Sequence, residues 1–213
     1  MNTSDIQTRD LVLIGGGHTH ALVLRMWGMA RLPGARVTVI NPGPTAPYSG
    51  MLPGFVAGHY TRDALDIDLV QLARFAGARI ILGAVTGVDR EQRTVFVPGR
   101  PPIGYDVLSV DVGLTADMPA LPGFGDHAVP AKPLGAFATA WDAQRDKDGP
   151  IVVLGGGVAG VELALAMAHA RQGRGGVTVV DRGRVLSVLP KRPRAQILRA
   201  LHRFDVQIIE HAD

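Results

Sequence analysis

The sequence predicts an α/β protein built from two similar strand–turn–helix–strand units, and an internal repeat carries most of that prediction. Residues 11–17, four strand-forming residues followed by three glycines, recur 140 residues later as residues 151–157. At the same offset, the β-branched residues 37–40 recur as residues 177–180. Two matches in one register indicate a duplicated unit. A composition of 46% hydrophobic and 19% charged residues provides a core for such a fold.

Each copy is expected to run in the order strand, glycine turn, helix, strand. Residues 18–29 and 158–170 follow the glycines as helix-compatible runs, and each second strand is a short β-branched run. Residues 151–170 also form an apolar stretch of twenty residues, long enough to cross a bilayer. Because glycines separate its β-branched half from its alanine-rich half, a buried strand, a tight turn and a buried helix are the better interpretation.

The glycines predict a phosphate-binding turn in each copy, with a purely structural turn as the alternative. A sharp strand-to-helix turn needs a residue that tolerates positive φ, and a pyrophosphate must approach the backbone N–H groups at the helix start. The second copy has the full Gly-x-Gly-x-x-Gly pattern, at Gly155, Gly157 and Gly160, and Asp181 follows the middle glycine by 24 residues. The first copy has Gly15 and Gly17. It departs from the pattern twice, because His20 replaces the third glycine and Asn41 replaces the acid.

His20 should widen the packing of the first helix on its strand, and Asn41 can still bond a ribose hydroxyl. The histidines otherwise have plain interpretations. His18 and His20 flank the helix start, where contact with phosphate or flavin and an ordinary helix-entry role are equally open. His59 lies beside Tyr60, near a substrate channel or simply in a loop. Their spacing with carboxylates does not suit a metal ion, and we predict no metal site.

The absence of cysteine excludes disulfides, thiolate-ligated metal clusters and a cysteine nucleophile within these 213 residues. Redox chemistry would therefore need a bound cofactor. The first ten residues lack the basic start and apolar stretch of a secretory signal, which predicts a cytoplasmic location.

Positive charge is concentrated between Arg171 and Arg203. This segment contains nine basic residues and one acid, whereas the net charge of the whole protein is +3. Such a segment suits a solvated helix face or a rim that attracts phosphate. A nucleic-acid-binding surface usually has aromatic residues between the basic ones, whereas this segment has only Phe204, at its edge. We therefore predict no nucleic-acid partner.

These motifs resemble the two-dinucleotide-binding-domain flavoproteins, the pyridine nucleotide-disulfide oxidoreductase superfamily. Within this superfamily the sequence resembles cysteine-free relatives of type II NADH dehydrogenases. In particular, residues 15–20, 47–54 and 57–60 are similar to the flavoprotein module found alone or fused to selenide, water dikinase. The resemblance implies two Rossmann-like domains of three-layer ββα architecture, the first binding FAD and the second NADH or NADPH.

Site residues for FAD follow from the same resemblance. It implies that Gly15 and Gly17 hold the pyrophosphate beside His18, and that Asn41 meets the adenosine ribose. It places Ser49, Gly50 and Met51 beside the isoalloxazine ring, and the alternative for these three residues is a plain loop. It also places Val85 near adenine and Gly113 in close approach to the cofactor. Asp111 stands where the family usually has alanine.

For NAD(P)H, the resemblance implies contacts from Gly155, Gly157 and Gly160, and places Glu162 near nicotinamide. A carboxylate in this apolar helix would need a partner if buried, and the alternative is an acid that complements the helix dipole. Asp181 favours NADH, because a carboxylate repels a 2′-phosphate. Arg182 and Arg184 leave NADPH open.

The resulting prediction is an FAD-dependent NAD(P)H oxidoreductase that passes electrons to a quinone or another small acceptor, with no residue assigned as catalytic. The alternatives are a redox partner in selenium metabolism and a non-catalytic nucleotide-binding fragment or redox sensor. The predicted partners include a second copy of the chain or a fused or neighbouring C-terminal portion. Without a transmembrane segment, the predicted location stays cytoplasmic, with peripheral attachment to the inner face of the membrane as the alternative.

The predicted domains are an FAD-binding domain over residues 10–130, a linker and helix over residues 131–149, and part of an NAD(P)-binding domain over residues 150–213. In the family both domains need further closing segments. A length of 213 residues therefore leads us to expect a truncated chain, its second domain incomplete, that binds FAD weakly and turns over poorly by itself.

Overall fold

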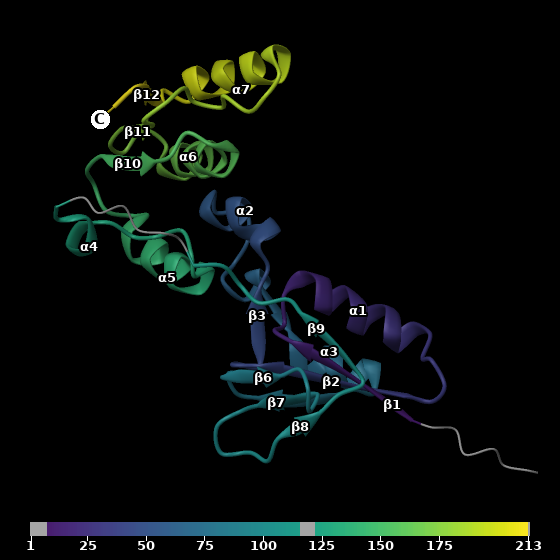
Figure 1. Ribbon diagram of the computed structural model, residues 1–213. Coiled ribbons are helices and arrows are strands. Elements are labelled where there is room, and N and C mark those ends of the chain that lie inside the picture. Colours follow the sequence, from purple (N-terminus) through teal and green to yellow (C-terminus); the bar gives the residue numbers. More distant parts are fainter. Residues whose placement is uncertain (1–7, 116–121, 213) are drawn as a thin grey trace, which may run out of the picture. The chain divides into compact units, whose positions relative to one another are not determined.

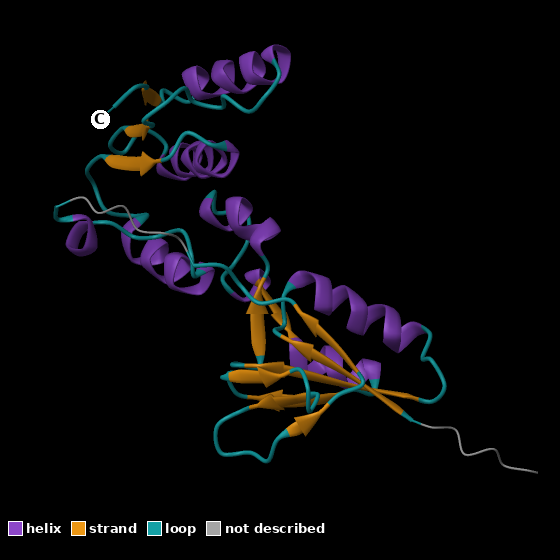
Figure 2. Cartoon of the chain, viewed as in Figure 1, coloured by secondary structure: helices purple, strands orange, loops and turns teal. Residues whose placement is uncertain are grey.

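The chain folds into two compact units, seen in a computed structural model that describes residues 8–115 and 122–212 (Figure 1). Among these residues, the first unit contains 8–48 and 66–115, and the second contains 49–65 and 122–212. Both units mix helices and strands, as Figure 2 shows, which confirms the predicted α/β class. The division does not follow the predicted domain boundaries, because residues 49–65 and the predicted linker both belong to the second unit.

The first unit has the predicted three-layer ββα arrangement. Its central sheet is parallel, with the strand order β5-β2-β1-β9. The strands of this sheet are β1 (Arg9–Ile14), β2 (Ala35–Asn41), β5 (Arg79–Leu82) and β9 (Val107–Val110). The outer layers are helices α1 (His18–Met29) and α3 (Leu69–Ala76), and an antiparallel sheet of β6 (Gly87–Asp89), β7 (Thr94–Phe96) and β8 (Ile103–Gly104). Two further short strands, β3 (Thr45–Pro47) and β4 (Asp66–Asp68), pair with each other in antiparallel orientation.

Alternation along β1 explains why the central sheet is covered on both faces. Leu13 packs with Leu24 of α1 and with Ala73 of α3. Val12 and Ile14 point to the opposite face and share a cluster with β7. Successive side chains of a strand point to opposite faces, and a parallel sheet buries both.

The second unit is built around a parallel sheet of order β10-β11-β12 and several helices. Its strands are β10 (Ile151–Leu154), β11 (Val177–Val180) and β12 (Gln207–Ile209). Its α-helices are α2 (Leu52–Val56), α4 (Phe124–His127), α5 (Leu134–Gln144), α6 (Val158–Arg171) and α7 (Lys191–Arg203). Two 3₁₀ turns, η1 (Ser49–Met51) and η2 (Asp63–Leu65), flank α2.

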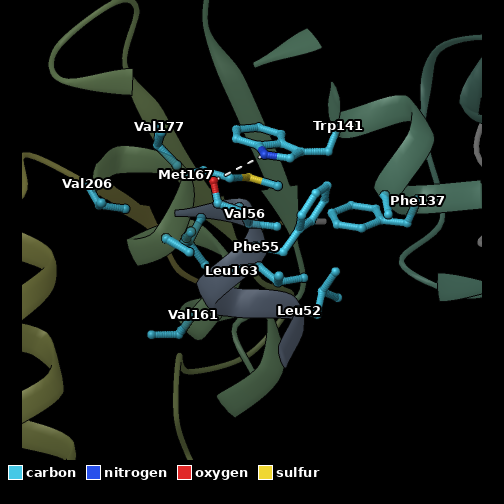
Figure 3. Close-up of a cluster of buried hydrophobic side chains, with 14 of the residues drawn as sticks. Leu52, Phe55, Val56, Phe137, Trp141, Val161, Leu163, Met167, Val177 and Val206 are labelled. Atoms are coloured by element: carbon cyan, nitrogen blue, oxygen red, sulfur yellow. Dashed lines mark hydrogen bonds between the residues drawn. The ribbon is translucent and has the colours of Figure 1, made fainter. Parts of the chain in front are cut away.

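Helices α2, α5 and α6 supply most of the core of the second unit (Figure 3). Phe55 of α2 and Trp141 of α5 are both nearly inaccessible to solvent. The indole N–H of Trp141 donates to the Val56 carbonyl oxygen at 3.1 Å, so the buried ring also has its polar atom paired. The short α2 is therefore fixed to this core by packing and by a hydrogen bond.

The 140-residue repeat is preserved in strand pairing as well as in sequence. In the first copy Leu11 pairs with Val37 and Ile14 pairs with Ile40. In the second copy the corresponding residues pair in the same way, Ile151 with Val177 and Leu154 with Val180. The predicted order of strand, glycine turn, helix and strand is confirmed in both copies.

The apolar stretch of residues 151–170 is divided between β10 and α6, as its glycines predicted. Within the described residues, we find no helix with the length and apolar character needed to span a bilayer.

The basic segment is largely the solvated helix face that its composition indicated, since Lys191, Arg192, Arg199 and Arg203 of α7 are exposed. Arg171 is an exception. Its side chain is buried, and it donates to the backbone carbonyl oxygens of Arg174 and Gly149 at 2.7 and 2.5 Å.

Candidate nucleotide-binding turns

Each glycine turn leaves the carboxyl end of a parallel strand and leads into a helix. Gly15 has a φ of +88° and Gly155 a φ of +109°, a backbone conformation that favours glycine. Gly17 and Gly157 are the N-caps of α1 and α6, and neither helix has an acid in its first turn. The exposed N–H groups at such a helix start favour a negatively charged ligand.

A side-chain oxygen from the second strand holds each turn at the same place. The Gly16 N–H donates to Asn41 Oδ1 at 2.9 Å, and the Gly156 N–H donates to Asp181 Oδ2 at 2.5 Å. Asn41 also donates from its amide nitrogen to the carbonyl oxygens of Gly43 and Thr45. The buried Asn41 therefore has both ends of its amide engaged within the protein, and its ribose contact stays a prediction.

Asp181 is held in its charged form. Its two oxygens accept from the Gly156 and Gly183 N–H groups, and these bonds lower the pKa of the carboxyl from its ordinary value. The nearby Arg182 acts in the same direction. A carboxylate that is ionised at neutral pH suits a 2′-hydroxyl and opposes a 2′-phosphate.

Asp181→Asn should remove part of the acid sensitivity of the second unit. A carboxyl whose pKa is lower in the folded state stabilises the fold above its unfolded pKa, and that stabilisation is lost as pH falls through the folded value. The wild type should therefore lose more stability than the variant between about pH 6 and pH 3. Urea unfolding across this range measures the difference, and identical pH slopes would contradict it. Asp205→Asn, which neutralises an exposed acid of the same unit, is the control.

The third position of the pattern is where the two copies differ most. A Cβ at Gly160 would come within 2.0 Å of the Gly155 carbonyl oxygen, so α6 lies close against its turn. His20 occupies the equivalent position of α1, and its Nδ1 instead lies 2.7 Å from the Gly15 carbonyl oxygen. Since no real Cβ fits at 2.0 Å, the first helix cannot pack on its turn as the second does. The wider crossing expected from the sequence stays a prediction.

Ser109 and Asp111 complete the surroundings of the first turn. The buried ring of His20 reaches Ser109 Oγ with its Nε2 at 2.9 Å. The His20 backbone N–H donates to Asp111 Oδ2 at 3.0 Å. Both partners lie about ninety residues away along the chain, so local sequence patterns give no signal for either contact.

The structure also places the other residues that were predicted to contact FAD. His18 is exposed, with its ring centroid 6.1 Å from that of Tyr48. The side chain of Val85 packs against the cluster under β6–β8, and a Cβ added at Gly113 would meet nothing within 4 Å. Residues 49–51, predicted to pass the isoalloxazine ring, form η1 in the second unit, whereas Gly15 and Gly17 lie in the first.

The prediction for the surroundings of Glu162 is corrected by the structure. It lies on α6 but is exposed, so the expectation that a buried carboxylate needs a partner does not apply. Its contact with nicotinamide stays a prediction.

Arg182 and Arg184 are also exposed. The ring of His59 lies beside that of His169 of α6, with centroids 5.1 Å apart.

Comparison with known proteins is consistent with this geometry. The family model described as pyridine nucleotide-disulphide oxidoreductase matches residues 9–213. An NADH dehydrogenase-like protein, YutJ of Bacillus subtilis, is 24% identical over 213 residues, covering 96% of this chain and 58% of the relative. The demethylphylloquinone reductase NdbB of Synechocystis is 26% identical over 149 residues, covering 62% of this chain and 35% of the relative. This chain thus spans about half the length of these relatives, or less.

Among solved structures, the fold is similar to that of reduced CoADR-RHD from Bacillus anthracis. The TM-score is 0.79 at 19% sequence identity, and the match covers 96% of this chain and 38% of that one. At this level of identity the match supports the fold alone.

Proposed function

Because the chain belongs to the pyridine nucleotide-disulphide oxidoreductase family, we propose that it acts as an FAD-dependent NAD(P)H oxidoreductase. The observation that carries this proposal is the pair of glycine turns. Both have the same strand register, and in both a backbone N–H of the turn donates to a side-chain oxygen, of Asn41 or of Asp181. We assign FAD to the first unit and NAD(P)H to the second. Flavin, when bound, supplies the capacity to accept a hydride from NAD(P)H and to release electrons to an acceptor.

The second turn fits a dinucleotide pyrophosphate. A Cβ at Gly157 would meet no described atom within 4 Å, so phosphate oxygens have space beside the start of α6. The role we give to this chain is to bind the pyrophosphate at that helix start and to hold the adenosine ribose against Asp181. NADH is the preferred donor in this proposal, because the carboxylate is charged.

For the acceptor, we favour a quinone over other small molecules. The support is the name of the Synechocystis relative, a demethylphylloquinone reductase. A water-soluble quinone added to the NADH-reduced protein should reoxidise the flavin. Reoxidation by oxygen alone, with no effect of the quinone, would count against this acceptor.

The visible spectrum tests the proposed function directly. The purified chain, titrated with FAD, should bind a yellow chromophore that bleaches when NADH is added without oxygen. A colourless protein that does not respond to NADH would overturn the proposal.

Gly157→Asp should weaken NADH binding at least tenfold while leaving flavin bound. Gly157 has a φ of −69° and a ψ of 174°, and an added Cβ would have free space, so aspartate fits and is a favoured N-cap. The introduced charge would then stand at the helix start where the pyrophosphate binds. Gly157→Asn, a neutral N-cap of the same shape, is the matched control. Titration calorimetry with NADH checks the result, and equal affinities for the two variants would contradict it.

A further inference from the structure

The Asp111 carboxylate lies against the start of α1 in the first unit. Its Oδ2 accepts the His20 N–H at 3.0 Å, and its backbone carbonyl oxygen accepts the Gly17 N–H at 3.3 Å. A Cβ at Gly17 would be 2.5 Å from the carboxylate carbon and from both of its oxygens. The space left by the missing side chain of Gly17 is therefore taken by the carboxylate of Asp111.

The backbone of Asp111 is fixed in this position by the central sheet. Its N–H donates to the Ile14 carbonyl oxygen at 2.8 Å, directly before the turn, and its own carbonyl oxygen lies 2.2 Å from where a Cβ of Gly15 would be. The chain thus passes over the turn with no room between, and the side chain projects to the helix start.

Helix α1 supplies no anion of its own at its first turn. It contains no acidic residue there, and its N-cap, Gly17, has no side chain to accept a hydrogen bond. By contrast, α3 is capped by its own Asp68, which accepts the Gln71 N–H at 2.9 Å. Asp111 provides to α1, from a different strand, the negative charge that favours a helix N-terminus.

The second turn lacks such a group among the described residues. The position of Gly157 is open, and α6 has neither a capping side chain nor an acid in its first turn. The two copies of one motif thus differ in charge at the place where each would meet a pyrophosphate.

We propose that Asp111 is an internal anion that competes with the cofactor pyrophosphate for the N-terminus of α1, and so sets the affinity of the first turn. This inference rests on the proposed function, because it concerns the site assigned to FAD. A dinucleotide that binds here must either displace the carboxylate from the His20 N–H or bind beside it against charge repulsion. Asp111 is thereby an affinity-determining residue of this site.

Asp111→Asn tests the proposal with little change in shape. The amide oxygen can still accept the His20 N–H, so only the charge is removed. Asp106→Asn is the matched control, since Asp106 precedes the same strand and its carboxylate accepts the Asp10 N–H at 2.6 Å, at the opposite end of β9. Each variant changes the net charge equally.

The probes are FAD, inorganic pyrophosphate and NADH, each titrated into the 213-residue chain freed of bound nucleotide. Calorimetry measures affinity, and the amide resonances of Gly17 and His20 locate the pyrophosphate. Asp111→Asn should tighten FAD and pyrophosphate binding about tenfold and leave NADH binding unchanged, whereas Asp106→Asn should change none of the three.

Equal pyrophosphate affinity in wild type and Asp111→Asn, absence of pyrophosphate binding from both, or weaker binding in the variant would overturn the proposal. The last result would make Asp111 a ligand-binding group instead. If neither protein binds FAD but pyrophosphate still discriminates between them at these amides, the role of Asp111 stands and the proposed function fails.

Discussion

Gly15→Ala is expected to destabilise the first unit by about 3–5 kcal/mol and to abolish the nucleotide binding that we propose for it. Two effects combine at this position. The φ of +88° is strained for any residue with a Cβ, and that Cβ would lie 2.2 Å from the carbonyl oxygen and 2.7 Å from the carbonyl carbon of Asp111. Both atoms belong to the backbone directly after β9, which is bonded to Ile14 of the central sheet, so they cannot move aside as a flexible side chain would.

Gly99→Ala separates the strain from the collision. Gly99 also has a positive φ, +72°, and a Cβ there would meet nothing within 4 Å. Its replacement should cost about 1–2 kcal/mol, which is the conformational penalty alone. Urea denaturation followed by circular dichroism measures both variants. Equal losses of stability would show that the Asp111 backbone does not constrain the turn.

Trp141→Ala is expected to remove about 3–5 kcal/mol from the stability of the second unit. The indole is 4% exposed and packs among Phe55, Phe137 and Met167 (Figure 3), so truncation leaves a large cavity. It also leaves the Val56 carbonyl oxygen without its hydrogen-bond donor.

Trp141→Phe keeps an aromatic ring in the core but loses the N–H donor, so it should cost clearly less than the alanine variant. Thermal unfolding by circular dichroism gives the ranking. The chain has one further tryptophan, Trp27 in the first unit, whose fluorescence reports whether that unit remains folded. A loss below about 1 kcal/mol for Trp141→Ala would contradict the importance of this core.

Local sequence patterns predicted the secondary structure around both glycine turns, because those turns depend on neighbouring residues. The offset between the two copies also has a structural counterpart, since Leu11 and Ile151 pair with their neighbouring strands in matching registers. What the patterns missed depends on contacts between distant segments. The pairing of His20 with Ser109 and with Asp111 is an example, since hydrophobic periodicity carries no information across ninety residues.

Glu162 shows a different reason for a wrong expectation. The surroundings of α6 appear apolar in sequence because alanine, at five of its fourteen positions, and larger apolar residues together fill most of the helix. In the structure, Glu162 and His169 lie on the solvent side, while Val161, Ala164 and Met167 lie in the core. Alanine suits either side, so it concealed which face of the helix is buried.

The division of the second unit along the chain has a consequence for biosynthesis. Residues 49–65 belong to this unit, yet the Val56 carbonyl oxygen meets its donor only at Trp141, 85 residues later. During synthesis, Phe55 and Val56 leave the ribosome long before α5 and α6 exist, and their apolar side chains have no core to enter. Contacts of such high sequence separation slow folding and prolong exposure of hydrophobic surface. The nascent chain should therefore be most prone to aggregation, and most dependent on chaperones, until about residue 167 has emerged.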